Sequence, residues 1–211
     1  MREILPGIHH WTTFHEGIRQ RVSSYYVEPA GALIDPMVPE EGLEWFAGRE
    51  RPQQALLTNR HHYRHSGRFA EAFGILVRAS EPSMHEFADG RAVEPFAFGD
   101  EVAPGITAIE IDAICPDETA LHIAVGDGAV ALADGLIRPR GGPLSFVDDP
   151  LIGDDPPTVK AALRDAFGGL LVRDFDTLLF AHGEPLVGGG KAALREFLQT
   201  PAGQEDYGPM A

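Results

Sequence analysis

Short apolar runs bounded by polar turns dominate the first half of the chain. Runs with the length and boundaries of strands occur at 23–28 (SSYYVE), 31–37 (GALIDPM), 53–59 (QQALLTN) and 75–80 (ILVRAS). Apolar residues at helical spacing occur at 39–50 (PEEGLEWFAGRE) and 67–74 (GRFAEAFG), and Ser66 is placed to cap the second of these. A short helix ended by Gly90 is predicted at 82–90.

The second half repeats this order of strands followed by helices. Residues 93–136 are strand-like, with a hairpin predicted around Gly126-Asp127-Gly128. A long loop rich in Pro, Gly and Asp follows at 138–157, and loops of this length in compact domains are often lids or binding loops. A helix (158–172), a strand (176–185) and a final helix (189–200) complete the pattern. Two sheet-then-helix halves favour a layered domain with sheets inside and helices outside.

Composition narrows the class of protein. Lys and Arg total 17 against 32 Asp and Glu, a net charge of −15, which repels nucleic acid and anionic membranes. The one cysteine, Cys115, excludes an intrachain disulfide, and we expect it to be a small buried residue. There is no secretory h-region and no apolar run of about 20 residues. We expect one cytoplasmic domain over 1–211, with a frayed tail at 201–211; its oligomeric state stays open.

Three strand ends carry residues that can bind a metal. The strand at 53–59 runs into the loop T-N-R-H-H-Y-R-H-S-G (58–67), ALA runs into Asp134, and LLFA runs into His182. Taken singly, Asp134 could be a turn residue and the loop histidines could pack on the next helix. Their common position after buried strands favours a shared site.

In these motifs the chain resembles the metallo-β-lactamase fold hydrolases. Their pattern T-H-x-H-x-D-H-x-G, with a later G-D and a G-H-G, places His62 and His65 on the second and last histidines of the loop. Asp134 then matches the bridging aspartate, and His182 matches the final histidine. The resemblance implies an α+β, four-layer αβ/βα sandwich, in which two mixed, mostly antiparallel sheets are flanked by helices.

The match departs from the pattern at two positions in the loop. Arg60 stands in place of the first histidine and Arg64 in place of the aspartate, while His61 falls at a variable position. The later P-G-H has no clean counterpart; the nearest text contains Cys115 and Asp117. A guanidinium is always charged and cannot replace an anionic ligand.

Two interpretations follow. In the first, the two-metal site is degraded and metal is weakly bound or absent. Arg60 and Arg64 then pair with Asp134, replace the metal, or bind an anionic small molecule. In the second, one divalent metal (Zn, Fe or Mn) is held by His65, Asp134 and His182, with His62 nearby. His62 and Asp134 are the catalytic candidates, and the substrate is an ester, thioester, amide or phosphodiester enclosed by the 138–157 loop.

Overall fold

The computed structural model describes residues 1–200, and its first half forms a seven-stranded sheet. The strands follow chain order: β1 (Arg2–Leu5), β2 (Ile8–His15), β3 (Gln20–Val27), β4 (Ala32–Ile34), β5 (Gln54–Leu56), β6 (Leu76–Ser80) and β7 (Glu94–Phe96). Strands β1 to β4 pair antiparallel, and β4 to β7 pair parallel. The sheet is therefore mixed.

The second half forms a five-stranded sheet. Its order is β14 (Thr177–Phe180), β11 (Ala129–Leu132), β10 (Thr119–Ile123), β9 (Ile106–Glu110) and β8 (Glu101–Ala103). All neighbours are antiparallel except β11 and β14. The predicted hairpin around Gly126 is confirmed as the β10–β11 turn. A small separate pair joins β12 (Leu136–Ile137) to β13 (Ser145–Phe146).

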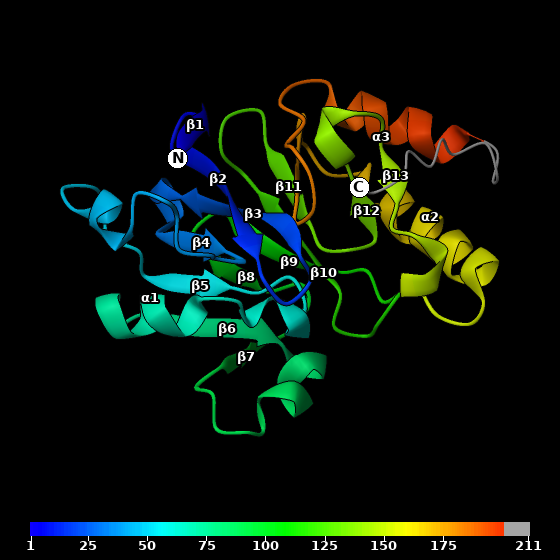
Figure 1. Ribbon diagram of the computed structural model, residues 1–211. Helices are drawn as coiled ribbons and strands as arrows, with labels where there is room; N and C mark the ends of the chain where they lie inside the picture. The colour runs from blue at the N-terminus through cyan, green and yellow to red at the C-terminus, as the bar shows by residue number, and fades with distance from the viewer. Residues whose placement is uncertain (201–211) are drawn as a thin grey trace.

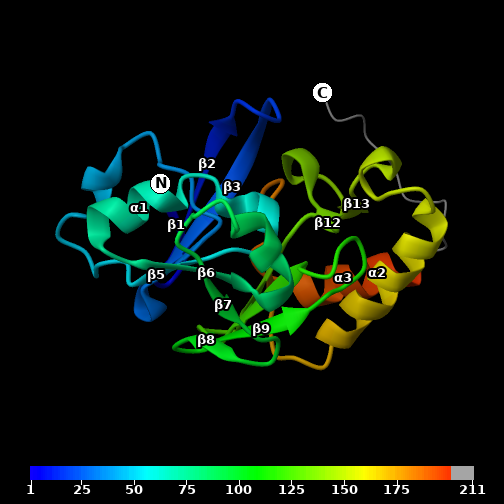
Figure 2. The same ribbon diagram turned by 90° about the horizontal axis from the view of Figure 1, so that it is seen from below.

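The two sheets face each other, and helices cover their outer faces (Figures 1 and 2). An apolar core that includes Tyr25, Leu56, Ile106 and Leu179 fills the space between the sheets. On the first sheet's outer side, α1 (Ser66–Phe73) packs through Phe69. On the second sheet's outer side lie α2 (Pro156–Leu170) and α3 (Gly190–Gln199). The predicted αβ/βα sandwich is confirmed.

Several local predictions need correction. The helix predicted at 39–50 is reduced to the 3-10 turn η2 (Leu43–Phe46), because Gly42 and Gly48 adopt φ of 74° and 80° on either side of it. Residues 81–87 also form a 3-10 helix, η4 (Glu81–Phe87). Ser66 is the first residue of α1 rather than its cap.

The predicted long loop and the predicted tail lie further along the chain. The 138–157 segment is not a plain loop, because it contains β13 and the 3-10 turns η5 (Pro139–Gly141) and η6 (Asp149–Leu151). The predicted frayed tail at 201–211 lies outside the described residues. Within residues 1–200, no helix combines the length and apolarity that crossing a bilayer requires.

Four cross-sheet hydrogen bonds hold the sheets together along one edge. Thr119 N donates to Thr58 O at 2.8 Å, and Ser23 N donates to Ala181 O at 2.9 Å. The buried Tyr25 hydroxyl donates to Phe180 O at 2.9 Å and accepts from Phe180 N at 3.0 Å. Burial raises the pKa of Tyr25, so the hydroxyl keeps its proton and can donate. These bonds fix the distance between strand ends of opposite sheets.

We predict that Tyr25→Phe lowers the free energy of unfolding by about 1–3 kcal/mol, because it leaves both polar groups of Phe180 without the phenol. Chemical denaturation monitored by circular dichroism measures the change. Tyr63→Phe is the control, since the Tyr63 hydroxyl has no hydrogen bond within residues 1–200 and its ring contact with Arg91 is kept. Equal stabilities for the two variants would contradict this role of Tyr25.

Candidate metal centre

Strand register brings Asp134 and His182 together. The parallel pair β11–β14 aligns Leu132 with Phe180, and each candidate ligand lies two residues beyond its strand's paired end. Gly183 then passes against the backbone of Arg138 with φ of 117°, where an added Cβ would lie 2.2 Å from Arg138 O. Only glycine fits this approach, which joins the segment after Asp134 to the segment after His182.

His62 reaches the same point from the other sheet. It follows β5 and lies in the 3-10 turn η3 (Arg60–Tyr63). Thr58 N donates to Asp35 Oδ1 at 2.8 Å, and Thr58 Oγ1 donates to Asp35 Oδ2 at 2.6 Å. His62 Nδ1 lies 3.0 Å from Asp35 Oδ2 and 2.9 Å from Thr58 Oγ1. Because Thr58 gives its proton to Asp35, Nδ1 carries the imidazole proton and Nε2 faces Asp134.

The ligand atoms of His62, Asp134 and His182 all lie within 4.8 Å of one another. The Nε2 atoms of His62 and His182 lie 3.2 Å and 3.1 Å from Asp134 Oδ1. Neither approach has hydrogen-bond geometry, so this buried oxygen has no hydrogen-bond partner within residues 1–200. A buried carboxylate oxygen without a partner is costly. Two imidazole nitrogens and one such oxygen around one point form a donor set that fits a divalent metal.

Asn59 is a site residue that the sequence reasoning missed. Its Nδ2 donates to Asp134 Oδ2 at 2.8 Å, and its Oδ1 accepts from His61 N at 2.9 Å. The side chain thus caps η3 and directs Asp134 Oδ1 toward the two histidines. An asparagine shortly after the strand, where an N-cap is favoured, was the available signal.

Opposing charges dominate the electrostatics of the site. Burial lowers the pKa of His62, but the carboxylates of Asp35 and Asp134 outweigh this and raise it to about 9. Burial alone would raise the pKa of both carboxyl groups. Nearby His62 instead holds the pKa of Asp35 below its usual value, and His62 with His182 holds that of Asp134 well below. Both aspartates are therefore anionic and able to balance a bound cation.

The structure does not bring His65 to the group. Arg64 turns the chain with φ of 43°, and His65 becomes the N-cap residue of α1. Its Nδ1 accepts from Val38 N at 3.0 Å, which leaves that nitrogen without a free lone pair. Of the four predicted metal ligands, the structure therefore brings His62, Asp134 and His182 together and leaves His65 outside this group.

Neither arginine forms the predicted ion pair with Asp134. Arg60 instead pairs with Asp117, whose Oδ2 also accepts from Arg60 N at 2.7 Å. Arg64 Nη1 donates to the backbone oxygens of Ser23 at 2.6 Å and Asp35 at 2.9 Å. Arg64 Nη2 is buried without a hydrogen-bond partner among the described residues. Both guanidinium groups line the pocket described next, which keeps their predicted role toward an anion open.

A pocket of about 650 Å³ opens over the metal-ligand group. His62, Asp134 and His182 line it together with Asn59 and Cys115. Cys115 is half-buried, and burial with the neighbouring carboxylates raises the pKa of its thiol to about 12. A neutral thiol is a poor nucleophile, so this pocket offers metal-ligand chemistry rather than cysteine chemistry.

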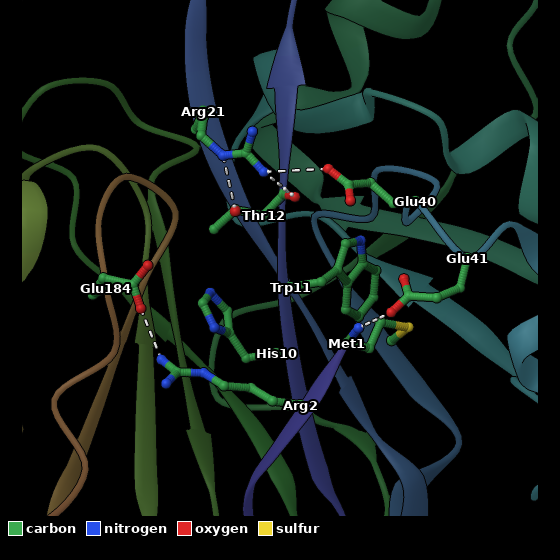
Figure 3. Close-up of a pocket in the computed structure, with 9 residues that line it drawn as sticks. All are labelled: Met1, Arg2, His10, Trp11, Thr12, Arg21, Glu40, Glu41 and Glu184. Atoms are coloured by element: carbon green, nitrogen blue, oxygen red, sulfur yellow. Dashed lines mark hydrogen bonds and ion pairs between the residues drawn. The ribbon is translucent and has the colours of Figure 1, made fainter.

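A second hollow of about 420 Å³ lies beside β1 and β2 (Figure 3). Four of its charged side chains form two ion pairs. Arg2 pairs with Glu184 at 2.7 Å, and Arg21 lies 3.8 Å from Glu40. His10 lines it too, but burial and the positive charge of Arg2 lower the pKa of His10 to about 4. Because these charged groups are already paired, this hollow offers fewer free polar groups to a ligand than the first pocket does.

Comparison with solved structures identifies the fold. A metallo-β-lactamase family protein of Thermus thermophilus is 16% identical with a TM-score of 0.64, covering 93% of this chain and 79% of its own. A metallo-β-lactamase from Hirschia baltica is 14% identical with a TM-score of 0.64, and the match covers 93% of this chain and 94% of that protein. A protein solved in a di-iron-bound form is 24% identical with a TM-score of 0.63, and the match covers 86% of this chain and 96% of that protein. No family model and no curated protein matches the sequence. The chain has the metallo-β-lactamase fold.

A buried acid lies behind the loop that carries Asp134. Glu118 Oε1 accepts from Gly135 N at 2.8 Å, and Oε2 has no hydrogen-bond partner within residues 1–200. Burial, together with the negative charge of Asp134, raises the pKa of Glu118 to about 7. The folded protein therefore holds the proton of Glu118 more tightly than the unfolded chain does.

This raised pKa predicts a loss of stability with rising pH. The ordinary pKa of a Glu side chain is 4.5, and below this pH Glu118 is protonated in both the folded and the unfolded state. Between pH 4.5 and about 7, only the folded state keeps the proton. The contribution of Glu118 to stability therefore falls as pH rises through this range. Glu118→Gln keeps the acceptor for Gly135 N and removes this dependence. Its unfolding free energy relative to the natural protein should rise by roughly 3 kcal/mol from pH 4.5 to pH 8. Urea denaturation across this range measures it.

The control is Glu110→Gln, which makes the same substitution at an exposed position on the neighbouring strand. A constant difference between Glu118→Gln and the natural protein from pH 4.5 to pH 8 would show that Glu118 does not titrate in this way.

Proposed function

We propose that this protein is a hydrolase that uses one divalent metal, held by His62, Asp134 and His182. The observation that carries the proposal is the buried Asp134 Oδ1, which has no hydrogen-bond partner among the described residues although two imidazole Nε2 atoms approach it at 3.1 and 3.2 Å. Three protein ligands with an open position are typical of catalytic zinc sites. Imidazole and carboxylate ligands also suit iron and manganese. The likeness to a protein solved in a di-iron-bound form supports iron in particular.

The arrangement supports one metal rather than two. A second metal would need further ligands beside Asp134, and the nearest candidates are unsuitable. His65 Nδ1 is engaged by Val38 N, and Arg64 contributes a half-buried positive charge. A divalent ion at about 4 Å from a guanidinium is repelled by several kcal/mol even at an effective dielectric of about 20. In this sense the two-metal site of the fold is degraded to a mononuclear one.

The surrounding residues hold the ligands ready. Asp35 and Thr58 fix the Nδ1 proton of His62, so Nε2 is the nitrogen that would coordinate a metal, once the metal displaces the proton that the raised pKa of His62 keeps there. Asn59 holds Asp134 Oδ2 and so orients Oδ1. A divalent ion bound there supplies Lewis-acid activation of water and of a carbonyl or phosphoryl oxygen. We therefore propose a small-molecule substrate with a hydrolysable ester, thioester, amide or phosphodiester bond.

We predict that protein purified without added metal contains close to one divalent ion per chain. His182→Ala and His62→Ala should each lose most of it, because two protein ligands are too few for tight binding. Elemental analysis of the desalted proteins gives the ratio. Hydrolysis of model esters should fall with the metal content and return when metal is restored to the natural protein.

His65→Ala is the matched control from the same loop, and it should keep its metal. Loss of metal in His65→Ala, or a content close to two ions in the natural protein, would contradict the proposed ligand set. A metal-free natural protein that hydrolyses esters in excess chelator would contradict the proposed chemistry.

Substitutions at Asn59 test how Asp134 is oriented. Asn59→Asp keeps the oxygen that accepts from His61 N but loses the donor to Asp134. We expect it to weaken metal affinity by about 10–100-fold, as changes to groups that hydrogen-bond a ligand usually do. Competition with a chromophoric chelator measures the affinity. Unchanged affinity in both Asn59→Asp and Asn59→Ala would show that Asn59 only caps η3.

A further inference from the structure

The pocket over the candidate metal centre is lined by both polar and aliphatic side chains. His62, Asp134 and His182 form the metal-ligand group, and further polar lining comes from His15, Gln20, Asn59, Arg60, His61 and Arg64. Seven aliphatic side chains also line the pocket: Ile18, Val22, Ile114, Ile137, Val147, Leu151 and Ile152. Four of these, Val22, Ile137, Val147 and Ile152, are buried. A wall of this kind binds apolar groups and excludes water.

Two of these aliphatic side chains are exposed to solvent. Ile18, in the turn between β2 and β3, is 49% exposed, and Leu151, in η6, is 61% exposed. Both line the pocket from different parts of the chain. Large aliphatic side chains left in water cost free energy, of the order of 25 cal/mol per Å² of apolar surface, which an apolar ligand passing between them recovers.

From this combination of residues we propose that the substrate is an ester or thioester of an aliphatic carboxylic acid. Its acyl chain lies along the aliphatic side chains, and its carbonyl group lies at the metal-ligand group. This inference rests on the proposed hydrolase function and adds the substrate class. A pocket of about 650 Å³ is in the range that encloses a ligand of drug-like size, which suits a medium-length acyl chain better than an acetyl group.

The charge of Arg64 agrees with such a substrate. Arg64 lines the pocket, and its Nη1 donates to backbone oxygens rather than to a carboxylate. Its positive charge favours a carbonyl oxygen and the carboxylate product. In the reaction, the oxygen of water bonds to the acyl carbon and the bond to the ester oxygen or thioester sulfur breaks. The leaving alcohol or thiol takes one proton of water, and the acid product releases the other.

Binding of ketones tests the inference separately from catalysis. Heptyl methyl ketone has the carbonyl and acyl chain of an octanoyl ester but cannot be hydrolysed, and acetone is its short counterpart. We expect heptyl methyl ketone to bind at least about tenfold more tightly than acetone by isothermal titration calorimetry, because six more methylene groups leave water. The same preference should appear as a higher kcat/KM for 4-nitrophenyl octanoate than for the acetate.

Variants of the two exposed aliphatic residues, Ile18 and Leu151, test where the acyl chain of the substrate lies. The double variant Ile18→Ser/Leu151→Ser should lose most of the preference for the longer ketone without unfolding, since both side chains are largely exposed. Val172→Ser/Val187→Ser is the matched control, because these valines are 82% and 46% exposed and do not line the pocket. It should behave as the natural protein does.

The metal-deficient variant His182→Ala separates the two proposals. It should hydrolyse neither ester and still prefer the longer ketone. Equal affinity of the natural protein for both ketones overturns the aliphatic substrate, even if the protein holds metal and hydrolyses acetate. If both double variants keep the same preference for the longer ketone, the position assigned to the acyl chain is overturned. A ketone preference without metal or hydrolysis in the natural protein supports the acyl pocket and overturns the proposed function.

Discussion

Parallel pairing of β11 with β14 is the constraint on which the site depends. The register that aligns Leu132 with Phe180 places the residues two positions further on, Asp134 and His182, side by side. The hydrogen bond from Thr119 N to Thr58 O then holds the end of β5 against the start of β10, which brings His62 over from the opposite sheet. The site is thus assembled by backbone hydrogen bonds between and within sheets, and the side chains meet because their strands end at one edge.

Charge burial is the cost that this geometry imposes. Asp35 and Asp134 are anionic beside His62, and the half-buried Arg64 donates to the backbone oxygen of Asp35. Asp35 and Arg64 also adopt φ of 46° and 43°, which non-glycine residues seldom do. Such strain is typical of functional sites, where the surrounding structure holds residues in positions they would not choose alone. A bound cation would balance the two carboxylates and coordinate Asp134 Oδ1, which has no hydrogen-bond partner among the described residues.

Much of the fold could be predicted from the sequence, and part of the site could not. Alternation of apolar runs and turns indicated both sheets, and the order of the motifs indicated the sandwich. The helix expected at 39–50 failed because helical spacing does not reveal that Gly42 and Gly48 take left-handed conformations. His65 was favoured by motif spacing, but the turn at Arg64 directs it to Val38, a long-range contact that no local pattern encodes. Asn59 was missed because its partner lies 75 residues away.

Anomalous diffraction from a crystal of the protein, purified without added metal, tests the central claim most directly. Data collected on both sides of the absorption edges of zinc, iron and manganese locate and identify a bound ion. The account predicts one anomalous peak per chain, within bonding distance of His62 Nε2, Asp134 Oδ1 and His182 Nε2. Two peaks, or a peak coordinated by His65, would contradict it, as would direct hydrogen bonds from both histidines to Asp134 with no peak between them.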